Sequence, residues 1–234
     1  MEGILRGEGL WQEAIADALR LVPRPIAADP RLLPRDMDDA PRGDRWDRSR
    51  FPPARAASTL LLVYPAADGS LTIPLTVRHA ALRNHAGEVS LPGGAVDPAD
   101  ASAEAAALRE AHEEVGVEPG LVRVLGTLDP VWIPVSNFEL QPFVGAIARR
   151  PVLRPHVAEV ASIVEMPLAH LLSEAALTEE LIEGDGWRLQ AGVYRYGGQR
   201  IWGATARILA MFTCAMQQVP SARSAPGADG GADR

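Results

Sequence analysis

Hydrophobic and polar positions alternate along this chain in blocks that predict both helices and strands. Near the N-terminus, the apolar residues of "GLWQEAIADALRLV" (9–22) recur at near-helical spacing, which predicts a short amphipathic helix. The apolar run "AASTLLLVYP" (56–65) predicts a buried strand. "SLTIPLTVR" (70–78) follows it across the turn signal "ADG", as expected for a hairpin.

The second half of the chain continues in the same way. Strand-like segments are "LVRVLGTLDPVWIP", "FELQPFVGAIA" and "VASIVEMPL". "LAHLLSEAAL" (168–177) predicts a helix, and "WRLQAGVYRYGGQRIW" predicts a hairpin with Gly197-Gly198 at its tip. "GATARILAMFTCAMQQV" predicts a last helix. Because strands and helices are interleaved, we expect an α/β or α+β fold with a mixed sheet.

These patterns divide the 234 residues into three parts. Residues 1–55 hold the first helix and a Pro/Arg-rich arm, where the prolines of 23–55 exclude a regular helix or a central strand. Residues 56–217 are expected to form the main domain. Residues 218–234 are expected to form a tail, which has low complexity from Pro220 onward and is predicted to be disordered.

Composition and charge narrow the classes of function. A hydrophobic content of 47% predicts a packed globular protein, and a net charge of −7 argues against general affinity for nucleic acid or anionic membrane. No apolar run reaches the roughly 18–20 residues of a membrane span, and the N-terminus lacks the pattern of a signal peptide. The single cysteine, Cys214, allows neither an intramolecular disulfide nor a cysteine zinc cluster. We therefore expect a soluble cytoplasmic protein, monomeric or homodimeric.

The segment "GEVSLPGGAVDPADASAEAAALREAHEEVGV" (87–117) joins a glycine-rich loop to a glutamate-rich helix. The helix is predicted to start near Asp100 or Ser102 and to end at Gly116. At 100° per residue, three carboxylates share one arc about 100° wide, where they repel one another: Glu110, Glu113 and Glu114. A divalent cation removes that repulsion, and a set of oxygen ligands suits Mg²⁺ or Mn²⁺.

A solvated acidic face is the alternative explanation for these glutamates taken alone. The residues before the helix favour a site instead. Gly93 and Gly94 let the backbone approach a ligand closely. Arg78, Arg83 and His85 are candidate partners for phosphate in an otherwise acidic protein. Together these features predict a ligand that contains a metal-bridged diphosphate.

Residues 109–117, "REAHEEVGV", resemble the second half of the Nudix signature, G-x5-E-x7-R-E-U-x-E-E-x-G-U, where U is aliphatic. The first half departs from the pattern, because fourteen residues separate Gly94 from Arg109, one more than the signature has. Ala101 occupies the position of the first glutamate, and acidic residues lie nearby at Asp97, Asp100 and Glu104. That glutamate is generally regarded as structural in the family, so the departure concerns loop geometry more than chemistry.

A narrower resemblance is to the coenzyme A pyrophosphatase branch, whose upstream motif is L-L-T-x-R-[SA]-x3-R-x3-G-x3-F-P-G-G. "PLTVRHAALRNHAGEVSLPGG" supplies eight of its residues at the required spacing: Leu75, Thr76, Arg78, Arg83, Gly87, Pro92, Gly93 and Gly94. Three positions differ, namely Pro74, His79 and Leu91. "IWGATARIL" (201–209) is also similar to that branch, and the whole resemblance covers roughly 57–215.

The resemblance implies an α/β/α sandwich around a mixed β-sheet and an enzyme that hydrolyses a nucleoside diphosphate linked to another group. For coenzyme A, the products are 3′,5′-ADP and 4′-phosphopantetheine. The implied metal ligands are Glu110, Glu113 and Glu114, and Arg109 is expected to orient a glutamate through a salt bridge. The implied substrate-binding residues are Arg78, Arg83, Gly93 and Gly94. The alternatives are ADP-ribose, NADH or a nucleoside triphosphate as substrate, or a non-catalytic binding module, which the retained glutamates argue against.

The general base of many Nudix enzymes comes from outside the signature. Glu159, in "PHVAEVASIVEMPL", precedes a predicted strand and is our candidate. Glu139 is the rival, and an ordinary surface carboxylate is the alternative for either residue.

Overall fold

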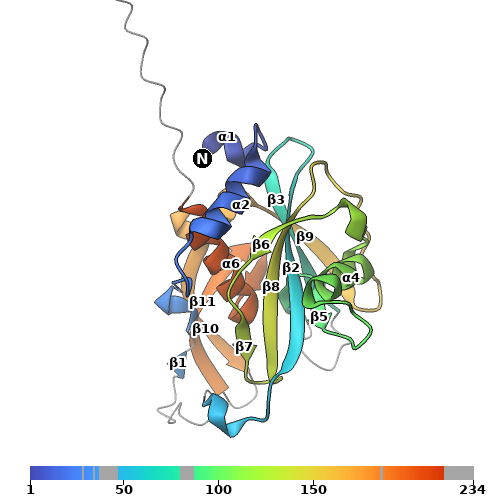
Figure 1. Ribbon diagram of the computed structural model, residues 1–234. Helices are drawn as coiled ribbons and strands as arrows, with labels where there is room; N and C mark the ends of the chain where they lie inside the picture. Colours follow the sequence, from blue (N-terminus) through green and yellow to red (C-terminus); the bar gives the residue numbers. More distant parts are fainter. Residues whose placement is uncertain (28, 34, 37–46, 80–86, 185–186, 219–234) are drawn as a thin grey trace, which may run out of the picture.

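The computed structural model describes residues 1–27, 29–33, 35–36, 47–79, 87–184 and 187–218. At its centre lies an eight-stranded sheet with the order β4-β3-β2-β8-β6, in which β5 also pairs with β2, β7 with β8 and β9 with β3 (Figure 1). Its strands are β2 (Arg55–Pro65), β3 (Leu71–Arg78), β4 (Val89–Ser90), β5 (Gly93–Ala95), β6 (Arg123–Thr127), β7 (Val131–Ile133), β8 (Phe138–Ala146) and β9 (Val160–Pro167). β2 and β8 are parallel and the other pairs are antiparallel, so the sheet is mixed, as predicted.

β2 is buried on both faces, as expected of a strand inside a layered fold. Leu60 and Leu62 pack in a cluster with buried residues of the helix α4 (Ala103–Val115). Leu61 and Val63 belong to a larger cluster on the opposite face. Helices cover both faces of the sheet (Figure 1), which confirms the predicted α/β/α architecture.

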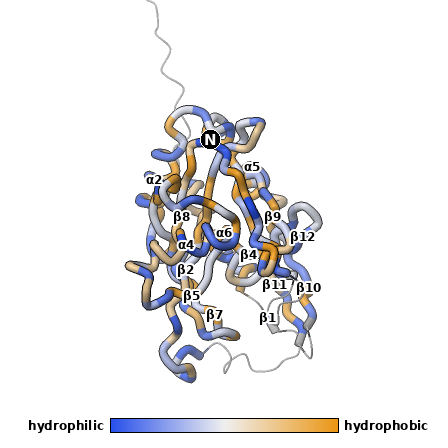
Figure 2. Tube along the Cα trace, turned by 90° about the vertical axis from the view of Figure 1, so that its right-hand side faces the viewer, coloured by the Kyte–Doolittle hydropathy of each residue, from blue (hydrophilic) through white to orange (hydrophobic). Residues whose placement is uncertain are grey.

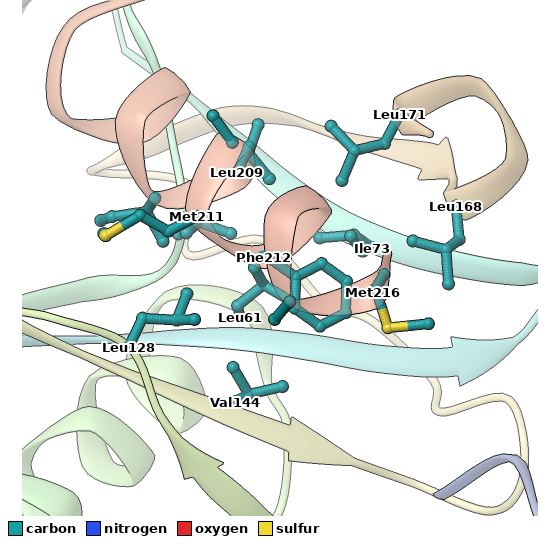
Figure 3. Packing of buried hydrophobic residues seen from close by; sticks show 14 of the residues in the cluster. Leu61, Ile73, Leu128, Val144, Leu168, Leu171, Leu209, Met211, Phe212 and Met216 are labelled. Atoms are coloured by element: carbon teal, nitrogen blue, oxygen red, sulfur yellow. The ribbon is translucent and has the colours of Figure 1, made fainter. Parts of the chain in front are cut away.

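Two helices share the second face, α6 (Gly203–Met216) and α2 (Trp11–Leu21). Figure 3 shows Phe212 of α6 beside Leu61 of the sheet. Ile15 of α2 lies in the same cluster, so the predicted N-terminal helix packs onto the same core as α6. Hydrophobic segments accordingly run along the central strands (Figure 2). Within the described residues, no helix has both the length and the apolar character needed to cross a membrane.

A second, smaller sheet has β11 at its middle, flanked by β10 and β1, and β12 also pairs with β11. Its strands are β1 (Arg35–Asp36), β10 (Leu177–Gly184), β11 (Trp187–Tyr196) and β12 (Gln199–Ile201). Gly197 and Gly198 both have positive φ and form the tip of the predicted β11–β12 hairpin. β10 was not expected, because its charged residues hide the strand pattern in "LTEELIEG".

The helix predicted over 168–177 is wrong for most of its length. α5 (Leu168–Leu171) has a single turn, a 3-10 turn follows at Glu174–Ala176, and Leu177 already pairs with Tyr194 in the second sheet. The Ser173 hydroxyl donates to the carbonyl oxygen of His170 at 2.8 Å. Such a local bond competes with helix formation.

The described residues of the arm between α2 and β2 form only short elements, in agreement with the proline content of the arm. They are the 3-10 turn η1 (Pro30–Leu32), the strand β1 and the 3-10 turn η2 (Arg48–Arg50). Two further short elements among the described residues are α1 (Glu2–Leu5) and η3 (Pro119–Leu121). Residues 37–46 of the arm and the tail predicted from Pro220 lie outside the described residues.

Candidate active site

The glutamate helix α4 is defined by the caps at its two ends. The Ser102 hydroxyl accepts a hydrogen bond from the N–H of Ala105 at 3.1 Å, and Gly116 ends the helix in a left-handed conformation with φ of 73°. Ser102 rather than Asp100 is therefore the N-cap. The buried Ala111 and Val115 turn one face of α4 to the sheet. The glutamate arc then lies against the loop that contains Gly93 and Gly94.

Glu114 is the most buried of the three glutamates, with only 5% of its surface exposed. The N–H of Gly93 donates to its carboxylate at 3.4 Å. Burial raises the pKa of Glu114 to about 7, and the neighbouring charge of Glu110 adds to the increase. The charge of Arg78 opposes this increase. A buried carboxylate of this kind is stabilised when a cation binds beside it.

Glu110 lies one helical turn before Glu114 and contacts the same loop. Burial raises its pKa, while a 3.0 Å hydrogen bond from Arg109 opposes the shift. A Cβ atom at Gly94 would lie 2.5 Å from Oε1 of Glu110. Only glycine leaves room for this approach of the loop to the helix.

Gly93 is fixed by a second close approach, on the side of the sheet. β5 pairs with β2, with Gly93 opposite Thr59. A Cβ atom at Gly93 would lie 2.4 Å from the carbonyl oxygen of Ser58. The two glycines therefore hold the loop between the edge of β2 and the carboxylates of α4.

Arg109 is the centre of an ion-pair network. Its Nε and Nη2 donate to the two oxygens of Asp100, each at 3.0 Å. Its Nη1 donates to Glu110 at 3.0 Å and to Glu113 at 2.9 Å, and Nη2 also donates to the carbonyl oxygen of Ala95 at 3.3 Å. All five N–H donors of the guanidinium thus have an acceptor. Arg109 therefore positions the carboxylates and has no N–H donor left for a ligand.

Asp97 and Asp100 explain how the chain accommodates the extra residue before Arg109. The Asp97 carboxylate accepts from the N–H of Ala99 at 2.9 Å, and Asp100 accepts from the N–H of Asp97 at 2.8 Å. Asp100 also forms an ion pair with Arg109, and this ion pair links the turn to the helix α4. The sequence pointed to these acidic residues, but not to the pairing of Asp100 with Arg109.

Arg78 is the described member of the two arginines predicted to contact the substrate. It ends β3, and its Nε is buried without a hydrogen-bond partner among the described residues. Its positive charge lowers the pKa of Glu114 and so opposes the effect of burial on that carboxylate. Arg83 and His85 lie outside the described residues.

The two candidates for the general base have different surroundings. Glu159 is exposed and directly precedes β9. Its segment is held against the end of α4, because the N–H of His156 donates to the carbonyl oxygen of Glu114 at 2.9 Å. Burial is the main cause that raises the pKa values of Glu110 and Glu114. The negative charge of Glu159 adds a smaller increase to both. Glu139 instead forms an ion pair with Arg48 at 2.7 Å.

The chemistry of this donor set fits a hard divalent cation, because it offers carboxylate oxygens beside a glycine backbone. The buried Glu114, with its raised pKa, and the partly buried Glu110 are the residues best suited to hold one. Glu113 is mostly exposed and turned toward Arg109. In the described part of the chain, no three acidic, histidine or cysteine side chains are drawn together in a ready metal-ligand set.

One feature beside the glutamates was not predicted. A cavity of about 600 Å³ lies next to Glu110, at the end of the sheet where β2 begins, and Arg55 and Phe138 form part of its wall. These two residues are paired by the parallel register of β2 and β8. No local pattern in the sequence brings them together.

Comparisons with known proteins agree with this geometry. A family model for the NUDIX domain matches residues 55–180. The chain is 43% identical over 138 residues to an "Uncharacterized Nudix hydrolase NudL" of Pectobacterium atrosepticum, covering 59% of this chain and 71% of that protein. It is 44% identical over 159 residues to the protein of the same description in Citrobacter koseri, covering 66% of this chain and 79% of the relative.

Among solved structures, a Nudix hydrolase from M. smegmatis, RenU, matches 50% of this chain and 73% of its own, with 26% identity and a TM-score of 0.42. Nudix hydrolases generally use divalent metal ions and act on small nucleotide substrates. The matched residues 55–180 include β2, the Gly93–Gly94 loop and all of α4. This chain therefore belongs to the Nudix family and is a Nudix pyrophosphohydrolase.

Proposed function

We propose that this enzyme hydrolyses the diphosphate bond of coenzyme A or a derivative of it, giving 3′,5′-ADP and 4′-phosphopantetheine. The observation that carries the proposal is Arg78. It is the first arginine of the motif shared with the coenzyme A pyrophosphatase branch, and its buried Nε has no hydrogen-bond partner among the described residues. A buried N–H of a guanidinium that lacks an acceptor is suited to a phosphate oxygen.

The metal site in this proposal uses Glu110 and Glu114, with Glu113 as a third carboxylate, one oxygen of which accepts from Arg109. The loop of Gly93 and Gly94 lies against the same carboxylates, since the N–H of Gly93 reaches Glu114. When bound, Mg²⁺ or Mn²⁺ would neutralise the diphosphate and lower the pKa of a water molecule. This chemistry favours attack of water on phosphorus.

Side chains outside the metal site have separate roles in this proposed reaction. Glu159 is our candidate for the general base, because its exposed carboxylate acts on the glutamate cluster and has no ion-pair partner within the described ranges. Arg109 positions Glu110 and Glu113 through its hydrogen bonds. Arg78, with Arg83 from the same motif, would bind phosphate oxygens and hold the scissile bond in the reactive orientation.

A hydrolysis screen tests the substrate directly. Purified protein is incubated with Mg²⁺ or Mn²⁺ and with coenzyme A, acyl-coenzyme A, ADP-ribose, NADH or a nucleoside triphosphate, and the products are separated by chromatography. We expect the highest kcat/KM with coenzyme A or its acyl form, and 3′,5′-ADP as a product. A clear preference for ADP-ribose, NADH or a triphosphate would contradict the proposed substrate, while the pyrophosphohydrolase chemistry would stand.

A further inference from the structure

The cavity beside Glu110 has walls from four parts of the chain. The start of β2, the start of β8, the turn after β5 and the helix α4 all contribute to it. The lining residues that matter here are Arg55, Arg109, Glu110 and Phe138. Because Glu110 belongs to the proposed metal site, a substrate whose diphosphate lies there can extend one of its ends into this cavity.

The two arginines of the cavity differ in what they can still bind. All five donors of Arg109 are occupied by Asp100, Glu110, Glu113 and the carbonyl oxygen of Ala95. Arg55 is exposed, and within the described ranges its guanidinium has neither a carboxylate nor a carbonyl partner. Arg55 is therefore the cation of this cavity that is available to a ligand.

The guanidinium of Arg55 is held by an aromatic ring. Its central carbon lies 4.1 Å from the centroid of the Phe138 ring. A guanidinium over the face of a ring is attracted by the ring, and its N–H donors can still bind the oxygens of a phosphate group. This contact favours one position of the side chain before a ligand arrives, which lowers the entropic cost of binding.

The end of the Pro/Arg-rich arm keeps this pair in place. Arg48 forms a 2.7 Å ion pair with Glu139, the neighbour of Phe138 in β8. The side-chain amide of Asn137 donates to the carbonyl oxygen of Pro52 at 3.2 Å, and the Phe51 ring stands edge-on to Trp132. The arm therefore packs beside the strand ends that carry Arg55 and Phe138, and residues 48–52 do not line the cavity themselves.

We propose that this cavity binds a phosphate monoester carried by the substrate outside its scissile diphosphate, with Arg55 as the residue that recognises it. The inference rests on the proposed function, since coenzyme A carries such a group at the 3′ position of its ribose. It assigns to the arm and to Arg55 a role in substrate selection, separate from the role of Arg78 at the diphosphate.

Paired ligands that differ only in this phosphate provide the test. In the first measurement, kcat/KM is determined for coenzyme A and for dephospho-coenzyme A with the wild type, Arg55→Ala and Arg55→Lys. We expect Arg55→Ala to lower the ratio of the two values by about 10-fold or more, the scale of a lost charge-assisted hydrogen bond. Arg55→Lys, which keeps the charge but loses the planar fork, should recover part of that ratio.

The matched control is Arg149→Ala. Arg149 is an exposed arginine that follows the opposite end of β8 from Phe138. The control should leave both the ratio and the absolute rates unchanged. If Arg55→Ala lowers kcat/KM equally for the two substrates, the cavity binds a part that both share, and the phosphate assignment is wrong. An unchanged ratio and unchanged rates in Arg55→Ala would also overturn it.

A binding measurement separates this inference from the proposed substrate. The dissociation constants of 3′,5′-ADP and 5′-AMP are measured by calorimetry without divalent metal, for the wild type and Arg55→Ala. We expect the wild type to prefer 3′,5′-ADP and the variant to lose that preference. If the wild type fails to hydrolyse coenzyme A but the binding preference depends on Arg55, only the proposed substrate is wrong. If Arg55→Ala keeps the preference, the cavity assignment fails whatever the substrate.

Discussion

Asp100 and Arg109 form a two-point ion pair, with Nε–Oδ1 and Nη2–Oδ2 distances of 3.0 Å each. The Asp100 side chain is only 7% exposed. The hydrogen bond from Arg109 is the main cause that lowers the pKa of Asp100. Asp100 thus anchors the arginine that in turn holds Glu110 and Glu113. The proposed metal ligands depend on a residue outside the regular spacing of the Nudix signature.

Replacement of Asp100 tests that dependence. Asp100→Asn loses the charge that fixes Arg109, so we expect kcat/KM and metal affinity to fall by about 10–100-fold, as for other residues that orient metal ligands. Asp97→Asn is the control, because the Asp97 carboxylate accepts from the N–H of Ala99 and has no hydrogen bond to Arg109 within the described residues. Metal titration and steady-state kinetics measure both effects. Equal and small effects of the two substitutions would show that Arg109 does not need its anchor.

Glu114→Gln keeps the size of the side chain and removes its charge. If Glu114 binds the metal, kcat at saturating Mg²⁺ should fall on the order of 10²-fold or more, while circular dichroism shows a folded protein. Glu118→Gln is a suitable control, since Glu118 is an exposed glutamate just beyond the end of α4. Near-normal turnover by folded Glu114→Gln at saturating Mg²⁺ would remove Glu114 from the metal site.

The raised pKa of Glu114 makes the stability of the metal-free protein depend on pH. Burial raises this pKa from an ordinary value of 4.5 to about 7, so between these values the folded protein holds a proton that the unfolded chain releases. The free energy of unfolding should therefore fall as pH rises from about 4.5 to about 7, by on the order of 2–3 kcal/mol from this group. Urea denaturation with a chelator at several pH values measures the change.

Glu114→Gln serves as the control in that experiment as well. A glutamine cannot titrate, so this part of the pH dependence should disappear. If the wild type and the variant follow the same curve of stability against pH, the pKa of Glu114 is not raised in the folded protein.

A comparison of Glu159 and Glu139 tests the assignment of the general base. Glu159→Gln should lower kcat by about 10²–10⁴-fold with little change in KM, because proton transfer contributes on that scale. Glu139→Gln should retain most of the activity, since Glu139 is engaged by Arg48. Kinetics over a range of pH, with the melting temperature as a check on folding, distinguishes the two residues. The reverse order of effects would make Glu139 the base.

The close approach of Gly93 to β2 predicts a loss of stability on substitution. In Gly93→Ala, the new methyl group would meet backbone atoms, the nearest 2.4 Å away. Relief of such a contact requires movement of the loop or of β2, with an expected cost of about 1–3 kcal/mol in the free energy of unfolding. Gly120→Ala is the control, because nothing lies within 4 Å of the position of its Cβ. Thermal denaturation of both variants checks the prediction.

The parts of the molecule that sequence could predict are those determined by local chemistry. Ser102 and Gly116 mark the ends of α4, and the Gly197-Gly198 tip marks a hairpin, because capping and turn conformations depend on a few neighbouring residues. The resemblance to the Nudix signature identified Glu110, Glu113 and Glu114 as the candidate metal ligands. The helix predicted at 168–177 failed because Leu177 gains a partner in a sheet that the local pattern does not reveal.

The parts that sequence missed depend on pairing between distant segments. Arg55 and Phe138 are adjacent only because β2 and β8 align in parallel. The bond between Asp100 and Arg109 depends on the path of the turn before α4, which the altered spacing concealed. Both features arise from tertiary contacts rather than from residue preferences.

The parallel pairing of β2 with β8 also affects the order in which the elements of a newly synthesised chain can fold. Parallel neighbours cannot be joined by a tight turn, so every element from β3 to β7 is synthesised before β2 gains this partner. Phe143 of β8 and Ile147, which directly follows β8, help to close the core beneath α4. On the ribosome, the glutamate helix emerges long before its apolar face is fully covered. Completion of the catalytic centre is therefore tied to the emergence of the segment around residues 138–147.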